Sequence, residues 1–422
     1  MPLPTSRMQA CALQNLQAFV LGELLALGLR EHNHAVARLE SQLTVMHQAR
    51  DFPWYELGRL LAYEKDAVHR KNLWLYSLKK ARLLEGALQA RKQKTAQLLE
   101  QLGMDEARAT QLFRNVDLEA LSLTLQARLE ETQSPWCAQV QALAASQGDM
   151  ETATRADLPF FFQAKHLSEA RYFPAQQQAA VVDAVFERLG LWPSSRLVRH
   201  IAEAQLPLPL ALNGGLGVSQ LSLAPAQGLG SLRQWLGNMG RAVSWTHVAQ
   251  SEWACRHLGP PIVSNASALV FARLAQDKSW LAEQAVPETI AEEWERVLGA
   301  QAELEFRKTA AHFLAHMASR TLGPNEAATT YVSLQAEVLC VQPLEAEAAR
   351  LHVEGEEFFA MADQLRSALL AEHMWKHLQA RFGKTWWHAP EAGAWLRALW
   401  HEGNAVPAEL AIATSPTLPS SR

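Results

Sequence analysis

The 422-residue sequence has few cysteines, and none has a spacing that suits a metal or redox motif. Its four cysteines, Cys11, Cys137, Cys255 and Cys340, stand far apart, and no CxxC pair occurs. Zinc fingers, thioredoxin-like redox sites and disulfide-rich secreted scaffolds all depend on closely spaced cysteines. The sequence excludes these classes, and we expect all four side chains to be reduced thiols in the core.

Long runs of charge of one sign are also missing. The chain has 39 Lys and Arg against 43 Asp and Glu, which gives a formal net charge of −4. Proteins that bind nucleic acid or a membrane surface usually concentrate positive charge in patches or tracts. We therefore expect neither nucleic acid nor a membrane as a partner.

The N-terminus lacks an uninterrupted apolar run. Residues 8–30 are rich in Leu and Ala, but Gln9, Gln14, Asn15, Gln17 and Glu23 interrupt them. A signal peptide needs roughly 7–15 consecutive apolar residues, and a membrane span needs about 20. We expect an amphipathic first helix and a cytoplasmic protein.

Apolar residues recur at helical spacing through most of the chain, so the sequence predicts a mostly α fold. Residues 133–154 contain a proline among small and polar residues, and we expect a hinge there. Short alternating runs in residues 195–226, broken by Pro and by a GGLG turn, are the only region where we expect strands.

The stretch from residue 229 to 280 predicts two packed helices at the centre of the protein. Leu232, Trp235, Leu236 and Met239 recur at helical spacing after a Gly-rich loop. A second apolar helix follows Pro260-Pro261, a dipeptide that is typical of a helix start.

Several stretches together resemble the thimet oligopeptidase and oligoendopeptidase F family, whose members have a gluzincin metallopeptidase fold. They are EKDAVHRKNLWLYSLK, the DLP and FPA segments of residues 157–175, the two-helix stretch, and RFG, WW, PEAG and LRALW near the C-terminus. The resemblance covers roughly residues 55–402. It implies a two-lobed, mostly α fold with a small β-sheet beside the active-site helix. The expected parts are an N-terminal helical lobe (1–150), a catalytic-type lobe (151–402) and a disordered tail (403–422).

The resemblance fails at the zinc site. In this family an HExxH motif supplies two His ligands and a general base, and a Glu on the next helix completes the site. The matching positions here are Gly237, Asn238, Arg241 and Asn265, and no HExxH occurs anywhere in the chain. Gly237 offers no ligand, and Arg241 is a permanent cation that repels a divalent metal. Zinc is the family's cofactor, but we expect none here.

A second part of the family's mechanism is missing as well. The family places tyrosines late in the chain, where they stabilise the oxyanion of the transition state. The corresponding residues here, 353–370, contain Phe358 and Phe359 but no Tyr. The loss of two separate parts of the mechanism indicates a degenerate peptidase.

Other histidines leave a relocated metal as a weaker alternative. The candidates are the HxxxH pairs His312/His316 and His373/His377, and the set His247, Glu252 and His257. Each HxxxH pair shares one helical face and could chelate a metal, but neither has the Glu of HExxH or an identifiable third ligand. The last set is spaced by five, which does not align on a helix. We expect these residues to have structural or surface roles.

The sequence therefore predicts a catalytically inactive, metallopeptidase-like protein that binds a peptide or protein partner in its residual cleft. Asn238, Arg241 and Asn265 are the candidate ligand-binding residues. A buried Arg241 needs a carboxylate, which either a ligand or an internal acid could supply. The alternatives are an enzyme of the same fold with altered chemistry or a relocated metal, and a structural subunit of a complex. The oligomeric state is open.

Overall fold

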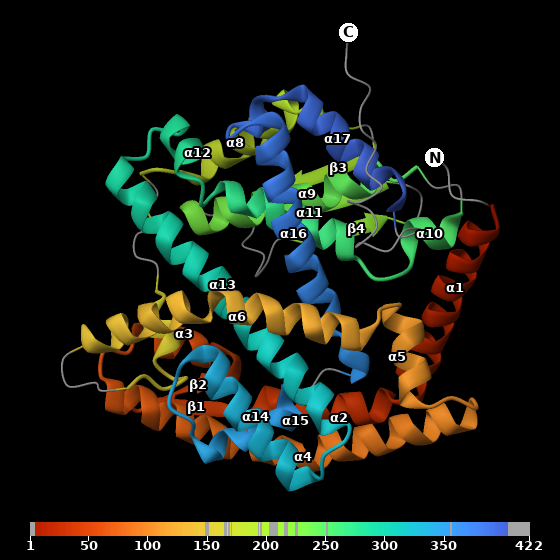
Figure 1. The fold of residues 1–422 in the computed structure, drawn as a ribbon, viewed down its shortest axis with the longest axis vertical. Helices are drawn as coiled ribbons and strands as arrows, with labels where there is room; N and C mark the ends of the chain where they lie inside the picture. The colour runs from red at the N-terminus through yellow and green to blue at the C-terminus, as the bar shows by residue number, and fades with distance from the viewer. Residues whose placement is uncertain are drawn as a thin grey trace. The chain divides into compact units, whose positions relative to one another are not determined.

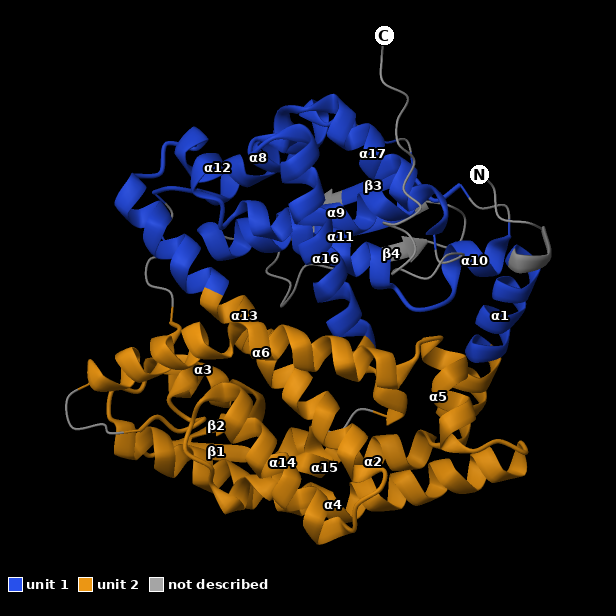
Figure 2. Ribbon diagram, viewed as in Figure 1, with its two compact units in different colours: residues 1–19, 164–299, 363–422 blue, residues 20–163, 300–362 orange. Residues whose placement is uncertain are grey.

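The computed structural model of the chain is mostly helical and divides into two compact units (Figures 1 and 2). The structure describes residues 5–147, 152–163, 167, 169, 171–192, 194, 196–201, 210–214, 218–223, 227–249, 252–354 and 357–403. Unit 1 comprises residues 1–19, 164–299 and 363–422, and unit 2 comprises residues 20–163 and 300–362.

Both units are built from separate segments of the chain, which differs from the predicted division at residue 150. Residues 300–362 group with the N-terminal half because α14 (Pro324–Leu339) packs on α6 (Leu118–Ala145). In addition, η2 (Glu345–Ala349) and α15 (Arg350–Val353) pack on α4 (Ala67–Gln101). Three helices contribute residues to both units: α1 (Thr5–Gly28), α13 (Glu288–Ser319) and α16 (Met361–Phe382). The predicted tail, apart from Gly403, falls outside the described residues.

The described residues of unit 2 form helices and one β-hairpin. Its helices are α2 (Arg30–Gln42), η1 (Trp54–Glu56), α3 (Leu57–Tyr63), α4 (Ala67–Gln101), α5 (Glu106–Arg114), α6 (Leu118–Ala145), α7 (Leu158–Phe161), α14 (Pro324–Leu339), η2 (Glu345–Ala349), α15 (Arg350–Val353) and η3 (Glu357–Phe359). Strands β1 (Thr44–His47) and β2 (Arg50–Pro53) pair antiparallel. The sequence did not predict this hairpin, because each strand has only four residues and its turn uses Gln48 and Ala49 at positive φ without a glycine.

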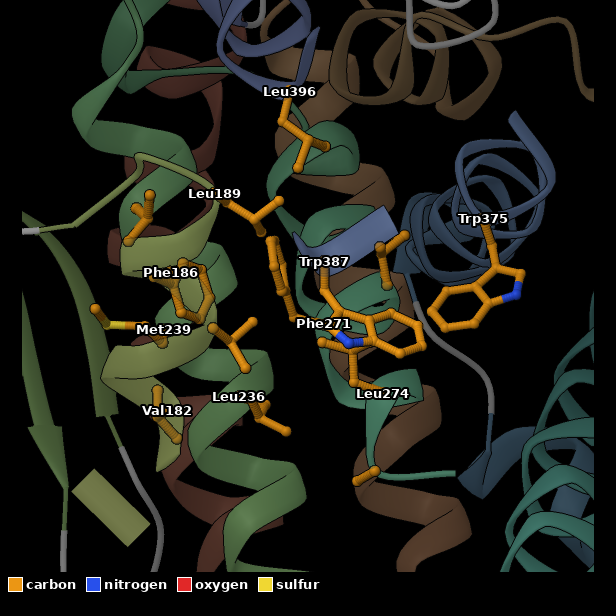
Figure 3. Packing of buried hydrophobic residues seen from close by; sticks show 14 of the residues in the cluster. Val182, Phe186, Leu189, Leu236, Met239, Phe271, Leu274, Trp375, Trp387 and Leu396 are labelled. Carbon is orange, nitrogen blue, oxygen red and sulfur yellow. The ribbon is translucent and has the colours of Figure 1, made fainter. Parts of the chain in front are cut away.

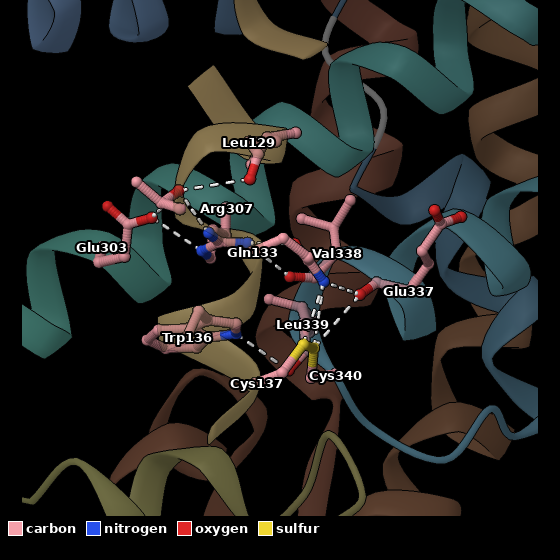
Figure 4. Close-up of a disulfide and its surroundings, with 11 residues drawn as sticks. Leu129, Gln133, Trp136, Cys137, Glu303, Arg307, Glu337, Val338, Leu339 and Cys340 are labelled. Atoms are coloured by element: carbon pink, nitrogen blue, oxygen red, sulfur yellow. Dashed lines mark hydrogen bonds and ion pairs between the residues drawn. A yellow bond between two sulfur atoms is a disulfide. The ribbon is translucent and has the colours of Figure 1, made fainter. Parts of the chain in front are cut away.

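Two other predictions for unit 2 are corrected by the structure. The expected hinge is helical as far as residue 145, since α6 continues through Pro135. The four cysteines are not all reduced: Cys137 on α6 and Cys340 after α14 form a disulfide, with Cα atoms 5.3 Å apart (Figure 4). Cys11 and Cys255 are free. A separation of 203 residues leaves no spacing signal for such a pair.

The buried carboxylate of Asp157 holds the DLP segment in unit 2. Asp157 Oδ1 accepts a hydrogen bond from Arg70 Nε on α4 at 2.8 Å, and both side chains are buried. Asp157 Oδ2 accepts from the backbone N–H and the hydroxyl of Thr154, at 2.9 and 2.7 Å. The ion pair therefore ties the start of α7 to the long helix α4.

Unit 1 surrounds a small sheet with helices. Its helices are α8 (Ala175–Arg188), α9 (Leu229–Thr246), α10 (Trp253–His257), α11 (Ile262–Leu274), α12 (Lys278–Glu283), η4 (Trp386–His388) and α17 (Pro390–His401). Strands β3 (Leu197–Ile201), β4 (Leu210–Gly214) and β5 (Val218–Leu223) form a sheet in the order β3-β5-β4. β3 runs parallel to β5 and β4 runs antiparallel to it. The sheet contacts α9, which confirms the predicted small sheet beside this helix.

Helix α9 lies at the centre of the unit 1 core (Figure 3). It begins after Gly228, and its apolar residues Leu232, Trp235, Leu236 and Met239 are all buried, as the sequence predicted. The same core contains buried tryptophans from the C-terminal segment: Trp375, Trp386, Trp387, Trp395 and Trp400. These side chains are core anchors, as expected of large aromatic residues.

Two glycines allow α9 to approach α11 closely. A Cβ on Gly237 would lie 3.2 Å from the carbonyl oxygen of Ala268 and 3.4 Å from the Cβ of Ala272. A Cβ on Gly240 would lie 2.5 Å from the Phe271 ring and 3.0 Å from the carbonyl oxygen of Ser267. The backbone of α11 therefore covers this face of α9.

Among the residues that the structure describes, one helix, Met8–Gly28, is long and apolar enough to cross a membrane by length and composition alone. The predicted polar interruptions do not prevent it from passing this test. A signal sequence or a core helix of a soluble protein would pass as well, so the evidence for a membrane span is weak. The cytoplasmic location stays a prediction.

The close contact between α9 and α11 predicts that Gly240→Ala destabilises the protein. We expect the free energy of unfolding to fall by about 1–3 kcal/mol, because the added methyl group must displace Phe271 and the α11 backbone. Gly230→Ala on the same helix is the matched control, since its Cβ would have no neighbour within 4 Å. That variant should be neutral or gain up to about 1 kcal/mol from helix propensity. Urea unfolding measures both, and equal stabilities would contradict the contact.

Candidate functional site

Gly237, which the resemblance aligns with the first histidine of HExxH, packs against a neighbouring helix. Gly237 is buried, and its Cα–H side faces Ala268 and Ala272 on α11. A histidine would need to extend several ångströms beyond a Cβ that already touches the α11 backbone. This position has no room for a metal-ligating imidazole in the present packing.

The two asparagines of the candidate site, Asn238 and Asn265, differ in their side-chain hydrogen bonds. The Nδ2 atom of Asn238 donates to the carbonyl oxygen of Gln234, one turn back on α9, at 2.9 Å. Asn265 is half-buried on α11 and has no side-chain hydrogen bond within the part of the chain that the structure describes. Neither amide can act as a general base.

Arg241 is half-buried on α9, and its Nε atom is buried without a hydrogen-bond partner among the described residues. Burial lowers the pKa of its guanidinium, and no carboxylate of the described chain opposes that shift. An internal acid that neutralises Arg241 was one of the two possibilities in the sequence. The described residues do not provide one.

A second arginine has the same character, and sequence reasoning missed it. Arg233 is half-buried, burial lowers its pKa, and the described chain supplies no ion pair or hydrogen bond to its side chain. It lies about one turn before Gly237, as Arg241 lies about one turn after, and the two arginines are roughly 80° apart around the helix axis. The Cα atoms of the two arginines are about 12 Å apart along the helix axis. The i, i+8 spacing was the available signal.

These residues do not fit a zinc ion. Zinc needs three neutral imidazole, carboxylate or thiolate ligands with a water in the fourth position. Gly237 faces α11, Asn238 is engaged with its own helix, and Arg241 brings a cation. In the described residues, no group of three His, Cys, Asp or Glu side chains could hold a metal ion.

The His312/His316 pair lies in the polar core of unit 2. Both Nε2 atoms are buried without a hydrogen-bond partner in the described chain, while His312 Nδ1 is 3.6 Å from Glu354. The two rings are stacked, with centroids 4.7 Å apart and planes 14° apart. An imidazole lone pair lies in the plane of its ring, so two nearly parallel rings cannot both point at one ion about 2 Å away. In this conformation the pair does not chelate.

The other histidine candidates are engaged in packing. His373 Nδ1 is 2.8 Å from the carbonyl oxygen of Leu369, and His377 stacks on Trp395 with a centroid distance of 4.6 Å. His247 stacks on Trp400 at 5.8 Å, and His257 packs against Trp253 at 5.5 Å. These contacts agree with the structural roles that the sequence suggested for them.

Phe358 and Phe359, which lie in the segment where the resemblance implies tyrosines, pack in the core. Both are buried and have positive φ angles, 52° and 53°. Phe358 packs on Phe113 of α5, and its carbonyl oxygen accepts a hydrogen bond from Arg114 Nε at 2.9 Å. Their rings have no hydroxyl with which to stabilise an oxyanion.

A buried ion cluster surrounds His312 in unit 2. Glu354 accepts two hydrogen bonds from Arg155 Nη2, at 2.8 and 3.0 Å, one from the Tyr331 hydroxyl at 2.5 Å and one from Arg350. Burial alone would raise the pKa of Glu354, but Arg155 and Arg350 hold it well below its usual range. Burial lowers the pKa of His312 to about 3 and that of His316 to about 4. Both histidines are neutral in the folded protein near pH 7.

Comparisons with known proteins identify the fold. PZ peptidase A with inhibitor 2 aligns over 94% of this chain and 75% of its own, with a TM-score of 0.65 and 11% identity. A structure assigned to oligoendopeptidase F aligns over 94% and 75%, with a TM-score of 0.63 and 12% identity. Another such protein, from Bacillus anthracis str. Ames, aligns over 96% and 75%, with a TM-score of 0.62 and 11% identity.

No protein-family model matches the chain, and no curated protein matches it significantly in sequence. The structural matches nevertheless confirm the two-lobed, mostly α oligopeptidase fold that the sequence motifs predicted. At 11–12% identity the likeness is one of fold.

The buried histidines predict that stability falls with acidity. Unfolded histidine has a pKa near 6.5, whereas burial lowers the pKa of His312 to about 3 and that of His316 to about 4 in the folded protein. Between these pH values the unfolded chain binds protons that the folded chain does not, which favours unfolding. Their contribution is complete above pH 6.5 and is lost as the pH falls. We expect the free energy of unfolding to be lower at pH 5 than at pH 7, by on the order of 1–2 kcal/mol for each histidine.

Urea unfolding at both pH values measures this difference. His312→Gln should reduce it, because glutamine does not titrate. His373→Gln, which changes an exposed residue on α16, should leave it unchanged. An equal pH dependence in all three proteins would show that His312 is already protonated in the folded state.

Proposed function

Starting from the oligoendopeptidase fold of this chain, we propose that it is a pseudopeptidase that binds a peptide or protein partner at Arg233 and Arg241 of α9 and does not hydrolyse it. The observation that carries the proposal is a pair of half-buried arginines on the former zinc helix, Arg233 and Arg241. Neither has an acidic partner among the described residues. The fold supports a relationship to peptidases, and the arginines support a changed role.

Folding removes part of the hydration of the Arg233 and Arg241 guanidinium groups. Removing a cation from water costs free energy unless an opposite charge compensates it. A folded protein that keeps two such cations on one helix gives up stability, and a carboxylate from outside the chain would recover it. A peptide offers carboxylates at its C-terminus and on Asp and Glu. Guanidinium groups bind carboxylates through two parallel hydrogen bonds, which gives orientation as well as affinity.

The residues that would support hydrolysis are absent from this helix. Asn238 stands where the general base would stand, and its amide is bonded to Gln234. Gly237 and Arg241 replace both imidazole ligands. A peptide that binds near Arg241 would therefore meet a cation and an amide, with no activated water and no nucleophile. Binding without turnover is the outcome that this chemistry favours.

Arg241→Met separates ligand binding from an internal ion pair. Methionine keeps a long, apolar side chain and removes the charge. We expect about a 10–100-fold loss of affinity for peptides with a free C-terminal carboxylate, the worth of a charge-assisted hydrogen bond. We also expect unchanged or higher stability, because an unpaired cation is removed. Fluorescence anisotropy with a labelled random hexapeptide library measures affinity, and urea unfolding measures stability.

The matched control is Arg188→Met. Arg188 belongs to α8 in the same unit, is largely exposed, and has Glu283 3.6 Å away. This variant should bind peptides as the natural protein does. If Arg241→Met lowered stability and left the affinity unchanged, Arg241 would instead have an internal carboxylate partner, and the proposed role would be wrong.

Metal content and peptide cleavage test the loss of catalysis directly. We expect much less than one metal ion per purified chain by elemental analysis. We also expect no cleavage of a quenched fluorogenic peptide library, with or without added zinc, because the ligands and the base are missing. One tightly bound metal per chain, with cleavage abolished by a chelator, would favour an enzyme of the same fold with a relocated metal. His312/His316 and His373/His377 would then be the first residues to replace.

A further inference from the structure

The first helix carries a stripe of exposed aliphatic side chains. Leu13, Leu16, Val20, Leu24 and Leu27 on α1 are between 44% and 71% exposed. Their spacing of 3, 4, 4 and 3 residues gives a mean of 3.5, so all five lie within about 80° of one another around the helix. The opposite side of α1 is buried through Leu21 and Leu25. We call these five residues the α1 stripe.

The α1 stripe is not explained by the core or by the candidate site. Only 17% of the most apolar window of this helix is buried. Glu23 is the one charged residue between Met8 and Gly28, and it lies at the edge of the stripe. A surface of this length with no cation is unusual for a solvated helix face, which is normally charged. Contiguous apolar patches of this size on a protein surface are often interaction sites.

The stripe is symmetric about Val20. Reading outward from Val20, the chain places Leu at four residues in one direction and four in the other, and then at seven in each direction. In an antiparallel pair of identical helices centred on Val20, Leu16 meets Leu24 of the second copy, Leu13 meets Leu27, and Val20 meets Val20. Every layer of the seam is then filled by aliphatic side chains. A two-fold interface needs this kind of self-complementary surface.

The exposed area sets the strength of such an interface. With about 200 Å² for a fully exposed side chain of this size, the exposed fractions of the α1 stripe amount to roughly 500 Å². If the contact covered all of it, two copies would bury at most roughly 1,000 Å², which is at the lower limit for specific association. The area therefore fits a weak dimer whose population depends on concentration.

We propose that two copies of this chain associate through an antiparallel pairing of their α1 helices, with Val20 on the two-fold axis. The partner is thus a second copy of the same chain. Phe19, which is 46% exposed and about 100° away from Val20 around the helix, lies outside the seam. This inference is independent of the proposed peptide binding on α9.

A lipid surface is the competing occupant, and the composition of α1 argues against it. Helices that lie in a membrane interface usually carry Lys and Arg on their polar side. Residues 8–28 contain neither. The polar side of α1 is also engaged in the fold, since the Asn15 amide donates to the carbonyl oxygens of Ala254 and Leu258, at 3.3 and 3.4 Å.

Substitutions of opposite charge at Val20 test the proposed pairing directly. Sedimentation velocity up to about 100 µM should show a monomer–dimer equilibrium for the natural protein. Val20→Glu and Val20→Lys should each weaken association by about tenfold or more, because like charges meet on the axis. A mixture of the two variants should associate as well as the natural protein. Phe19→Glu is the matched control and should leave association unchanged.

Disulfide trapping tests the register independently. In a Cys11→Ser background, Val20→Cys should form a covalent dimer under mild oxidation, and Phe19→Cys should not. Circular dichroism checks that each variant folds. A natural protein that stays monomeric at about 100 µM would overturn the proposal. Equal association of Val20→Glu and the natural protein would do the same, as would flotation of monomers with phosphatidylcholine vesicles.

Discussion

The approach of α9 to α11 through Gly237 and Gly240 is the contact on which unit 1 depends. Without a Cβ at either position, the two helices meet through backbone atoms, and the core residues of α9 fill the remaining directions. Hydrogen bonds that start from Trp400 on α17 stabilise the same contact. The Trp400 indole donates to Ser267 Oγ at 2.8 Å, and Ser267 donates to the Val263 carbonyl oxygen at 2.7 Å. The C-terminal helix thus fixes the rotation of α11 against α9.

This contact also decides the chemistry that the helix can perform. In a gluzincin, the side of the first helix that faces the metal must hold two imidazoles and leave space for an ion. Here, the contact with α11 occupies the position that the resemblance aligns with one of those imidazoles. Close packing therefore stands where a peptidase of this fold would need an open coordination sphere. The fold alone does not specify the chemistry of the site.

Features that depend on neighbouring residues could be predicted from the sequence, and features that depend on contacts between distant segments could not. The period of Leu232, Trp235, Leu236 and Met239 placed α9 and its buried face correctly, because helical burial repeats locally. The motifs around Asp157 and the late tryptophans led to the correct fold. The pairing of Cys137 with Cys340, the grouping of residues 300–362 with the N-terminal half and the closeness of Gly237 to Ala268 could not be inferred. Each depends on contacts between distant segments, and a single sequence carries no record of them. Arg233 could have been found, since eight residues place it about two turns before Arg241 and roughly 80° away from it around the helix.

The Cys137–Cys340 disulfide has a topological consequence. It closes a covalent ring of chain that includes the whole of residues 164–299, the central segment of unit 1, while both anchoring cysteines belong to unit 2. In the unfolded state, this ring restricts the chain across half its length. A protease that cuts once anywhere between residues 137 and 340 would leave a single covalent molecule, and only a reducing agent would release the two pieces.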